Sequence, residues 1–224
     1  MPGTPYFIFD LDGTLVDNVY QHVLAWKQAL DEEGLVVPTW RVHRRIGMSG
    51  SLLVRELARE LDAKVSPERA ERVARRHGET FKAITPAGRP LAGATDLLAY
   101  LSEHAIAWAI ATSGHAENAH AALGLLSVDP TTATIVTRDQ VRSAKPEPDL
   151  FVEAAARLQK PIEDAWVVGD SIWDMIAAER AQSLSIGLLS GGYAASELQQ
   201  AGAERIFDDP ADLLLHINEL LVQR

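Results

Sequence analysis

The feature that most constrains the fold of this 224-residue chain is a short apolar run, residues 7–9, that ends abruptly in the carboxylates Asp10 and Asp12. This pattern predicts a buried strand with acids at its carboxyl end, which is the edge where open α/β sheets bind ligands. Gly13 follows and lets the backbone turn sharply, so that N–H groups can face an anion. The alternative is an ordinary turn, because aspartate and glycine are common turn residues.

The second half of the chain alternates between helical and apolar strand patterns. Strands are predicted at residues 106–111, 134–137, 165–169 and 185–189, with helices at 94–104, 149–158, 170–181 and 210–222 and another ending near residue 123. Such alternation implies right-handed crossovers and a parallel sheet with helices on both faces. We therefore expect an α/β, Rossmann-like core domain made of residues 1–16 and 87–224.

The segment between these parts shows helical periodicity and no convincing strand. Helices are predicted from residue 19 to about Gly34 and at residues 39–46, 49–61 and 67–85, the last with Ser66 as a cap and Pro67 at its first position. The sequence thus predicts an α-helical cap domain, residues 17–86, inserted directly after the first strand.

Composition limits the class of protein and the kind of metal site. Hydrophobic residues make up 47% of the chain and charged residues 23%, which is typical of a globular protein. No apolar run could cross a bilayer and the N-terminus does not resemble a signal peptide, so we expect a cytoplasmic protein with no membrane partner. The chain has no cysteine, so oxygen or imidazole must hold any metal, and carboxylates suit Mg2+.

The net charge argues against one class of partner. A formal charge of −10 is unlike the basic surface of a nucleic-acid-binding protein, so we expect no nucleic-acid partner. Small anionic substrates remain possible, because one lysine, one metal ion and backbone amides can hold a phosphate inside an acidic protein.

Three further stretches place polar groups where predicted strands end. Thr112 and Ser113 can hydrogen-bond a phosphate oxygen, although such residues are also common helix N-caps. Lys145 lies in a proline-rich loop, which suits a fixed cation but is also compatible with a solvated side chain. Asp170 ends an apolar run and Asp174 follows four residues later, either as site carboxylates or as a helix cap and a first-turn charge.

Together the four stretches resemble the haloacid dehalogenase superfamily, in its phosphatase and phosphomutase branch with a helical cap, which includes phosphoglycolate phosphatases. Asp10-Leu11-Asp12-Gly13-Thr14 is similar to the first motif of that family and Thr112 to the second. Lys145 is similar to the third motif, and Gly169-Asp170-Ser171 with Asp174 to the fourth. The resemblance covers nearly the whole chain, including the helical insertion.

The resemblance implies a Mg2+-dependent phosphomonoester hydrolase that acts on a small phosphorylated metabolite. Asp10 would be the nucleophile that forms an aspartyl-phosphate, and Asp12 the general acid and base. Mg2+ would be held by Asp10, Asp170 and the Asp12 carbonyl oxygen, with Asp174 as a ligand or a neighbour of one. Lys145 and Thr112 would act on the transferring phosphoryl group, which the amides from Gly13 onward and Ser113 would also bind.

The cap of this branch recognises the rest of the substrate. Candidate substrate contacts are His22 on the first cap helix and Arg44 and Arg45 in the loop that runs to Gly50, since arginine makes bidentate contacts to carboxylates and phosphates. The alternative for the arginines is a solvated helix end. A substrate similar to phosphoglycolate or a small sugar phosphate is expected.

Two other functions remain open, a phosphomutase and a non-catalytic binding protein. His22 is similar to a histidine of the β-phosphoglucomutases, which keeps a phosphomutase possible, although Gly50 stands where those mutases carry arginine. A non-catalytic binding protein of the same fold is less favoured, because all four core motifs are present. Dehalogenation is disfavoured by Asp12, which dehalogenases of the family lack. The chain is compatible with a monomer or a homodimer.

Overall fold

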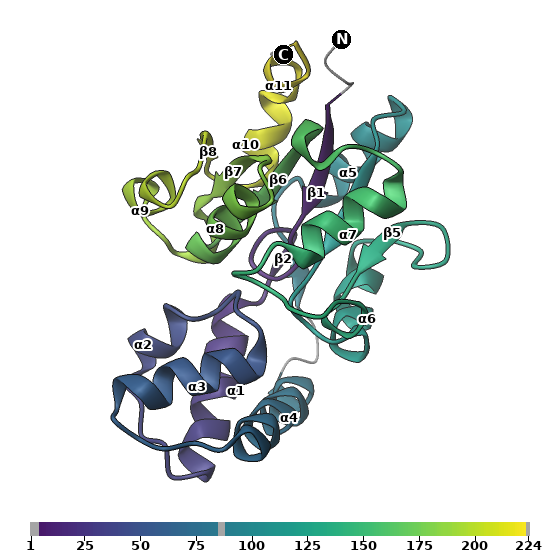
Figure 1. The fold of residues 1–224 in the computed structure, drawn as a ribbon. Helices are drawn as coiled ribbons and strands as arrows, with labels where there is room; N and C mark the ends of the chain where they lie inside the picture. Colours follow the sequence, from purple (N-terminus) through teal and green to yellow (C-terminus); the bar gives the residue numbers. More distant parts are fainter. Residues whose placement is uncertain (1–4, 85–87, 223–224) are drawn as a thin grey trace.

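The computed structural model describes residues 5–84 and 88–222. A parallel sheet with flanking helices forms one part, and four helices gathered at one end of that sheet form the other (Figure 1). Strand β1 (Tyr6–Phe9) and helix α11 (Ile217–Val222) reach toward the end of the core that faces away from these four helices (Figure 1).

The sheet has six strands in the order β5-β4-β1-β6-β7-β8, and every neighbouring pair is parallel. The strands are β1 (Tyr6–Phe9), β4 (Trp108–Ala111), β5 (Thr134–Val136), β6 (Ala165–Gly169), β7 (Leu184–Leu188) and β8 (Arg205–Phe207). β1 lies between β4 and β6, and its four residues are all fully buried. Because parallel strands share one direction, the groups that follow β1, β4 and β6 meet at one edge of the sheet.

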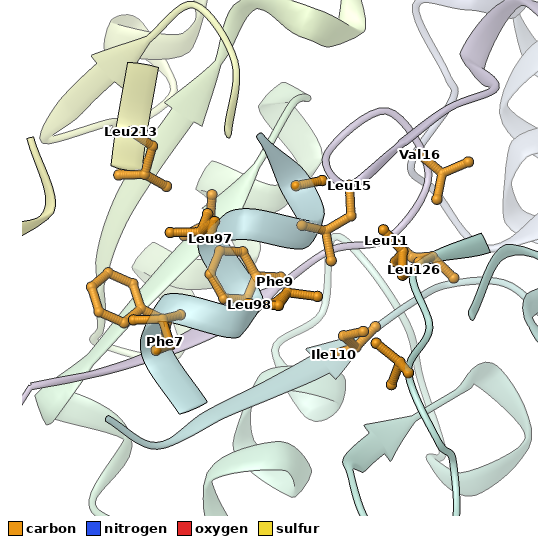
Figure 2. Close-up of a cluster of buried hydrophobic side chains, with 14 of the residues drawn as sticks. Phe7, Phe9, Leu11, Leu15, Val16, Leu97, Leu98, Ile110, Leu126 and Leu213 are labelled. Atoms are coloured by element: carbon orange, nitrogen blue, oxygen red, sulfur yellow. The ribbon is translucent and has the colours of Figure 1, made fainter. Parts of the chain in front are cut away.

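Alternate residues of β1 enter two different hydrophobic layers. Phe7 and Phe9 pack beside Leu97 and Leu98 of helix α5 (Figure 2). Tyr6 and Ile8 belong to the layer on the other face. The first layer is covered by α5 (Ala94–Glu103), α6 (Ala116–Leu125), α10 (Pro210–Leu215) and α11 (Ile217–Val222), and the second by α7 (Asp149–Leu158) and α8 (Ile172–Arg180).

The other part, which we call the cap, consists of helices α1 to α4 with a hydrophobic cluster of their own. The helices are α1 (Val19–Glu32), α2 (Thr39–His43), α3 (Gly50–Glu60) and α4 (Pro67–Ile84). A short antiparallel pair, β2 (Val16–Asp17) and β3 (Arg89–Pro90), joins the two chain crossings between cap and core. The cap therefore follows directly from the turn after β1.

The predicted α/β fold with a parallel Rossmann-like sheet is confirmed, and the differences concern short elements. The sequence did not predict β8 or α9 (Ala195–Gln200), because elements of three and six residues show too little periodicity. The predicted helix 210–222 is interrupted at His216, and the strand predicted from residue 106 begins at Trp108. The predicted end of the cap at residue 86 lies outside the described residues.

Among the described residues, no helix combines the length and the hydropathy needed to span a bilayer.

Candidate active site

Three buried strands deliver polar side chains to one edge of the sheet. Asp10 follows β1, Thr112 follows β4 and Asp170 follows β6. The Asp10 N–H donates to the Val168 carbonyl at 2.9 Å, so the hydrogen-bonding pattern of the sheet continues to the site itself. The structure thus brings together residues that lie up to 160 positions apart in the sequence.

Asp10 and Lys145 form the buried centre of this edge. The Lys145 ammonium, which has no exposed area, forms ion pairs with Asp10 and with Asp174, the latter at 2.8 Å between Nζ and Oδ1. Burial raises the pKa of Asp10 to about 7, with Lys145 opposing the rise and Asp174 adding to it. Burial by itself would lower the pKa of Lys145, but the two carboxylates outweigh it and raise that pKa. Lys145 is therefore a fixed cation behind Asp10.

Hydrogen bonds from neighbouring residues hold Asp170 and Asp174, and the missing side chain of Gly13 leaves room for Asp170. Thr14 Oγ1 donates to Asp170 Oδ1 at 2.9 Å, whereas Asp174 Oδ2 accepts from the Ser171 N–H at 3.1 Å and its hydroxyl at 2.6 Å. Gly13 has φ of +81°, and a Cβ there would lie 2.5 Å from Asp170 Oδ2. Only glycine satisfies both the backbone and the space at this position.

The acidic cluster fits a divalent metal ion. Asp10, Asp170 and Asp174 each offer one carboxylate oxygen within 4.8 Å of the others. Burial, and then the charges of Asp174 and Asp10, raise the pKa of Asp170 well above its usual value. Three buried carboxylates gather around one lysine, so Lys145 alone does not offset their negative charge. An oxygen-only donor set of this kind suits Mg2+.

Asp12 faces the cap rather than the acidic cluster. Its Oδ1 accepts a hydrogen bond from Asn18 Nδ2 at 2.5 Å and lies 3.4 Å from His22 Nε2. Burial would raise the pKa of Asp12, but His22 and Asn18 outweigh it and lower that pKa. Asn18 was not predicted from the sequence, although its position just before the first cap helix was a usable signal.

The groups predicted to bind phosphate lie around Asp10. Thr112 Oγ1 accepts from the Gly114 N–H at 3.0 Å, which leaves its hydroxyl hydrogen available to an anion. Ser113 differs, because its hydroxyl donates to the Gly47 carbonyl of the cap at 2.9 Å. Neither residue is the N-cap of α6, whose N-cap is His115. The N-cap alternative for Thr112 and Ser113 therefore does not apply.

A histidine pair on the cap faces Asp12. His22 Nδ1 lies 3.0 Å from His77 Nε2, which joins helices α1 and α4. The His22 ring stacks on Phe81 at 3.8 Å between centroids, and the His77 ring stacks on Trp26 at 3.9 Å. His77 was not predicted from the sequence, because a lone histidine in an amphipathic helix carries no signal of a partner 55 residues away.

The structure does not bring Arg44 and Arg45 into the site. Arg44 forms an ion pair with Glu197 of α9 and lies 4.0 Å from the Tyr193 ring centroid, and Arg45 forms an ion pair with Glu60 of α3. Neither arginine lines the cavity above Asp10, which has a volume of about 90 Å³. The lining includes Asp10, Asp12, Asp170, Thr112, Ser113 and Gly114 from the core and His22, Trp26, Gly47, Met48, Leu53, His77 and Phe81 from the cap.

Known proteins resemble this chain in sequence or in fold. A hydrolase from Pseudomonas syringae is 47% identical, with 96% of this chain and 98% of that chain covered and a TM-score of 0.94. Hexitol phosphatase A from Escherichia coli is 28% identical over 94% of this chain and 89% of its own length. Phosphoglycolate phosphatase from Agrobacterium fabrum is 26% identical over 100% of this chain and 96% of its own.

A family model described as haloacid dehalogenase-like hydrolase matches residues 7–188, which includes the cap and all the strands of the site. The chain therefore belongs to the haloacid dehalogenase-like hydrolases.

Proposed function

We propose that this protein is a Mg2+-dependent phosphomonoester hydrolase that acts on a small phosphorylated metabolite through an aspartyl-phosphate on Asp10. The observation that carries the proposal is the pairing of two carboxylates with different surroundings. Asp10 lies against Lys145 and the acidic cluster, whereas Asp12 lies against Asn18 and His22. Two relatives that are named as phosphatases support the same reaction class.

In the proposed first step, a carboxylate oxygen of Asp10 attacks the phosphorus atom and the bond to the leaving oxygen breaks. Asp12 gives its proton to that oxygen, so the product leaves as a neutral alcohol. In the second step Asp12 removes a proton from water, the water oxygen attacks phosphorus, and the bond to Asp10 breaks. Inorganic phosphate leaves and both carboxylates return to their starting states.

The surroundings of Asp12 favour one of its two oxygens as the carrier of the transferred proton. Oδ1 is occupied by the donors Asn18 and His22, which leaves Oδ2 for the proton. A Cβ at Gly114 would lie 3.9 Å from this Oδ2, so the oxygen lies near the Thr112 to Gly114 turn. A phosphate dianion bound there raises the pKa of Asp12 by charge repulsion and favours the protonated acid that the first step needs.

Asp10, Asp170 and the Asp12 carbonyl oxygen would hold Mg2+, with Asp174 as a further ligand or neighbour, and the bound ion would neutralise negative charge between the phosphate and the carboxylates. Lys145 holds the Asp10 carboxylate in place and offsets charge on the phosphoryl group. The Thr112 hydroxyl and the amides from Gly13 onward would donate to the phosphoryl oxygens.

The direct test is phosphate release from a panel of small phosphomonoesters, with Mg2+ and with EDTA. The matched variants are Asp10→Asn, which removes the nucleophile, and Asp96→Asn, which makes the same change at an exposed position on α5. We expect metal-dependent release by the wild type and Asp96→Asn, and a loss of at least about 10³-fold in Asp10→Asn. Near-normal release by a folded Asp10→Asn protein would contradict the nucleophile.

The same panel separates the two other activities. Conversion of β-glucose 1-phosphate to glucose 6-phosphate without phosphate release would indicate a phosphomutase. Absence of any turnover would favour a non-catalytic binding protein.

A further inference from the structure

The cap side of the cavity is apolar and aromatic. Trp26, Met48, Leu53 and Phe81 line it together with His22 and His77. No lysine or arginine lines the cavity among the described residues, and the undescribed segment 85–87 contains neither residue type. A substrate group that lies against the cap therefore meets no permanent positive charge.

The nearby cations already have partners. Lys145 is buried beneath Asp10 and bound to two carboxylates, and Arg44 and Arg45 are paired with Glu197 and Glu60. None of the three is available to a second anionic group of the substrate.

The three histidines that line the cavity do not replace these cations. His115 lies 2.5 Å from Asp139, between Nδ1 and Oδ1. His22 faces Asp12 on one side of its ring and His77 on the other. His77 is 8% exposed, and burial lowers its pKa well below the usual value, which disfavours a positive charge on this ring.

The charges that do face the cavity repel a second anion. Asp10, Asp12 and Asp170 line it, and Asp174 lies directly behind them. A carboxylate or second phosphate on the leaving group would lose water without gaining an oppositely charged partner, which is costly in a partly enclosed site.

One neutral polar group is available instead. The side-chain amide of Asn118, in the first turn of α6, lines the cavity and faces helix α4. A Cβ at Gly78 would lie 3.3 Å from its Nδ2. An amide of this kind can donate to or accept from a hydroxyl group without adding charge.

We propose that the leaving group of the substrate carries no charge, and that it is a hydroxylated or apolar alcohol which packs on Trp26 and Phe81 and hydrogen-bonds to Asn118. This inference rests on the hydrolase activity proposed above. It disfavours phosphoglycolate, whose leaving group carries a carboxylate, and bisphosphates such as those that a phosphomutase must hold.

Two substrate pairs that differ in one charge test the proposal. Phosphoglycolate is compared with 2-hydroxyethyl phosphate, and 6-phosphogluconate with sorbitol 6-phosphate. We expect kcat/KM to be higher for the uncharged member of at least one pair by about 10-fold or more. In neither pair should kcat/KM be higher for the charged member. Equal values in both pairs, or a preference for either carboxylate, would overturn the proposal.

An aryl phosphate assay distinguishes this failure from failure of the hydrolase assignment. Hydrolysis of p-nitrophenyl phosphate that disappears in Asp10→Asn shows the hydrolase independently of the natural leaving group. If the wild type hydrolyses neither p-nitrophenyl phosphate nor the four paired substrates, both proposals are wrong.

A gain-of-function pair tests the electrostatic cause. Met48→Lys supplies the missing cation on an unbranched side chain of similar length, and Met48→Gln is the uncharged control. Because Met48 is buried, Asn118→Lys and Asn118→Gln repeat the comparison at a partly exposed position. We expect a lysine to raise the relative kcat/KM for phosphoglycolate about 10-fold over its matched control. Folded lysine variants that hydrolyse p-nitrophenyl phosphate and leave that ratio unchanged would overturn the proposal.

Discussion

At the scale of single residues, the histidine pair determines how Asp12 is held. His77 is buried, and we assign the hydrogen between the two rings to its Nε2, which then donates to His22 Nδ1 across the 3.0 Å separation. His22 then carries its own hydrogen on Nε2 and presents it to Asp12 Oδ1. The opposite assignment would place a lone pair of His22 against a carboxylate, which is unfavourable. His77 is therefore a positioning residue that acts on Asp12 through His22.

This arrangement predicts different outcomes for two substitutions of His77. His77→Leu removes the donor to His22, and we expect kcat to fall roughly 10-fold. This loss is smaller than the roughly 10²–10⁴-fold that a general acid and base contributes, because Asp12 itself remains. His77→Gln keeps an N–H donor and should recover most of the activity, and KM should change little in either variant. Steady-state kinetics measure both, and equal kcat values in the two folded variants would contradict the positioning role.

Lys145 predicts a stability effect that is separate from catalysis. Replacing it with methionine leaves the buried carboxylates Asp10 and Asp174 without their cation. Loss of one member of a buried ion pair costs about 3–5 kcal/mol, so Lys145→Met should unfold at markedly lower urea concentration in the absence of Mg2+. The exposed Lys64→Met is the matched control and should change stability by less than about 0.5 kcal/mol. Equal midpoints for the two variants would contradict this reading.

At the scale of elements, the short helix α10 shows how the layer beneath β1 is closed. Asp209 is its N-cap and accepts hydrogen bonds from the N–H groups of Ala211 at 2.9 Å and Asp212 at 3.0 Å. Pro210 occupies the first position of the helix, and Leu213 packs into the same cluster as Phe7. The N-cap residue Asp209 therefore fixes the start of a helix that covers the central strand.

Asp209→Ala should destabilise the protein by about 1 kcal/mol, because two N–H groups lose their acceptor. The active site lies at the carboxyl edge of the sheet and Asp209 does not contact it, so kcat/KM should remain unchanged. Urea unfolding and steady-state kinetics of the same preparation give both values. Asp209→Ser retains a capping oxygen and should lose less stability. An Asp209→Ala protein as stable as the wild type would contradict the role of Asp209 as the helix N-cap.

At the scale of the whole molecule, side-chain and backbone contacts link the cap to the core. Arg44 pairs with Glu197, its carbonyl accepts from Trp173 Nε1 at 3.2 Å and from the Tyr193 hydroxyl at 3.1 Å, and His43 Nε2 lies 2.9 Å from the Gly191 carbonyl. Except for Arg44 and His43, these partners belong to the core. The structure thus places Arg44 at the interface between the two parts of the molecule, away from the cavity.

Weakening this interface should favour an open cap. We expect Arg44→Ala and Glu197→Ala each to raise KM roughly 2- to 5-fold, since a partly exposed ion pair contributes up to about 1 kcal/mol. Because the two residues share one interaction, the double variant should resemble either single variant. Small-angle X-ray scattering should show a larger radius of gyration in all three. Additive effects on KM would indicate that the two residues act separately.

Local patterns in the sequence were sufficient to predict much of the fold. A strand that ends in an acid is visible in a few consecutive residues, so the sequence indicated the strands before Asp10 and Asp170 and the α/β alternation around them. Short elements without periodicity, such as β8 and α9, were not visible. The sequence also indicated Thr112 and Lys145 as site residues, from their order and spacing relative to the two aspartates. The structure places both beside Asp10.

What the sequence by itself determined is the type of each strand end and the order of the polar groups along the chain, because both depend on neighbouring residues. Only the tertiary structure decided which groups meet. His22 contacts His77, Arg44 contacts Glu197, and the cap wall of the cavity carries neither lysine nor arginine among the described residues. These outcomes depend on how helices from distant parts of the chain pack, and ion pairs and hydrogen bonds between them leave no periodic signal in the sequence.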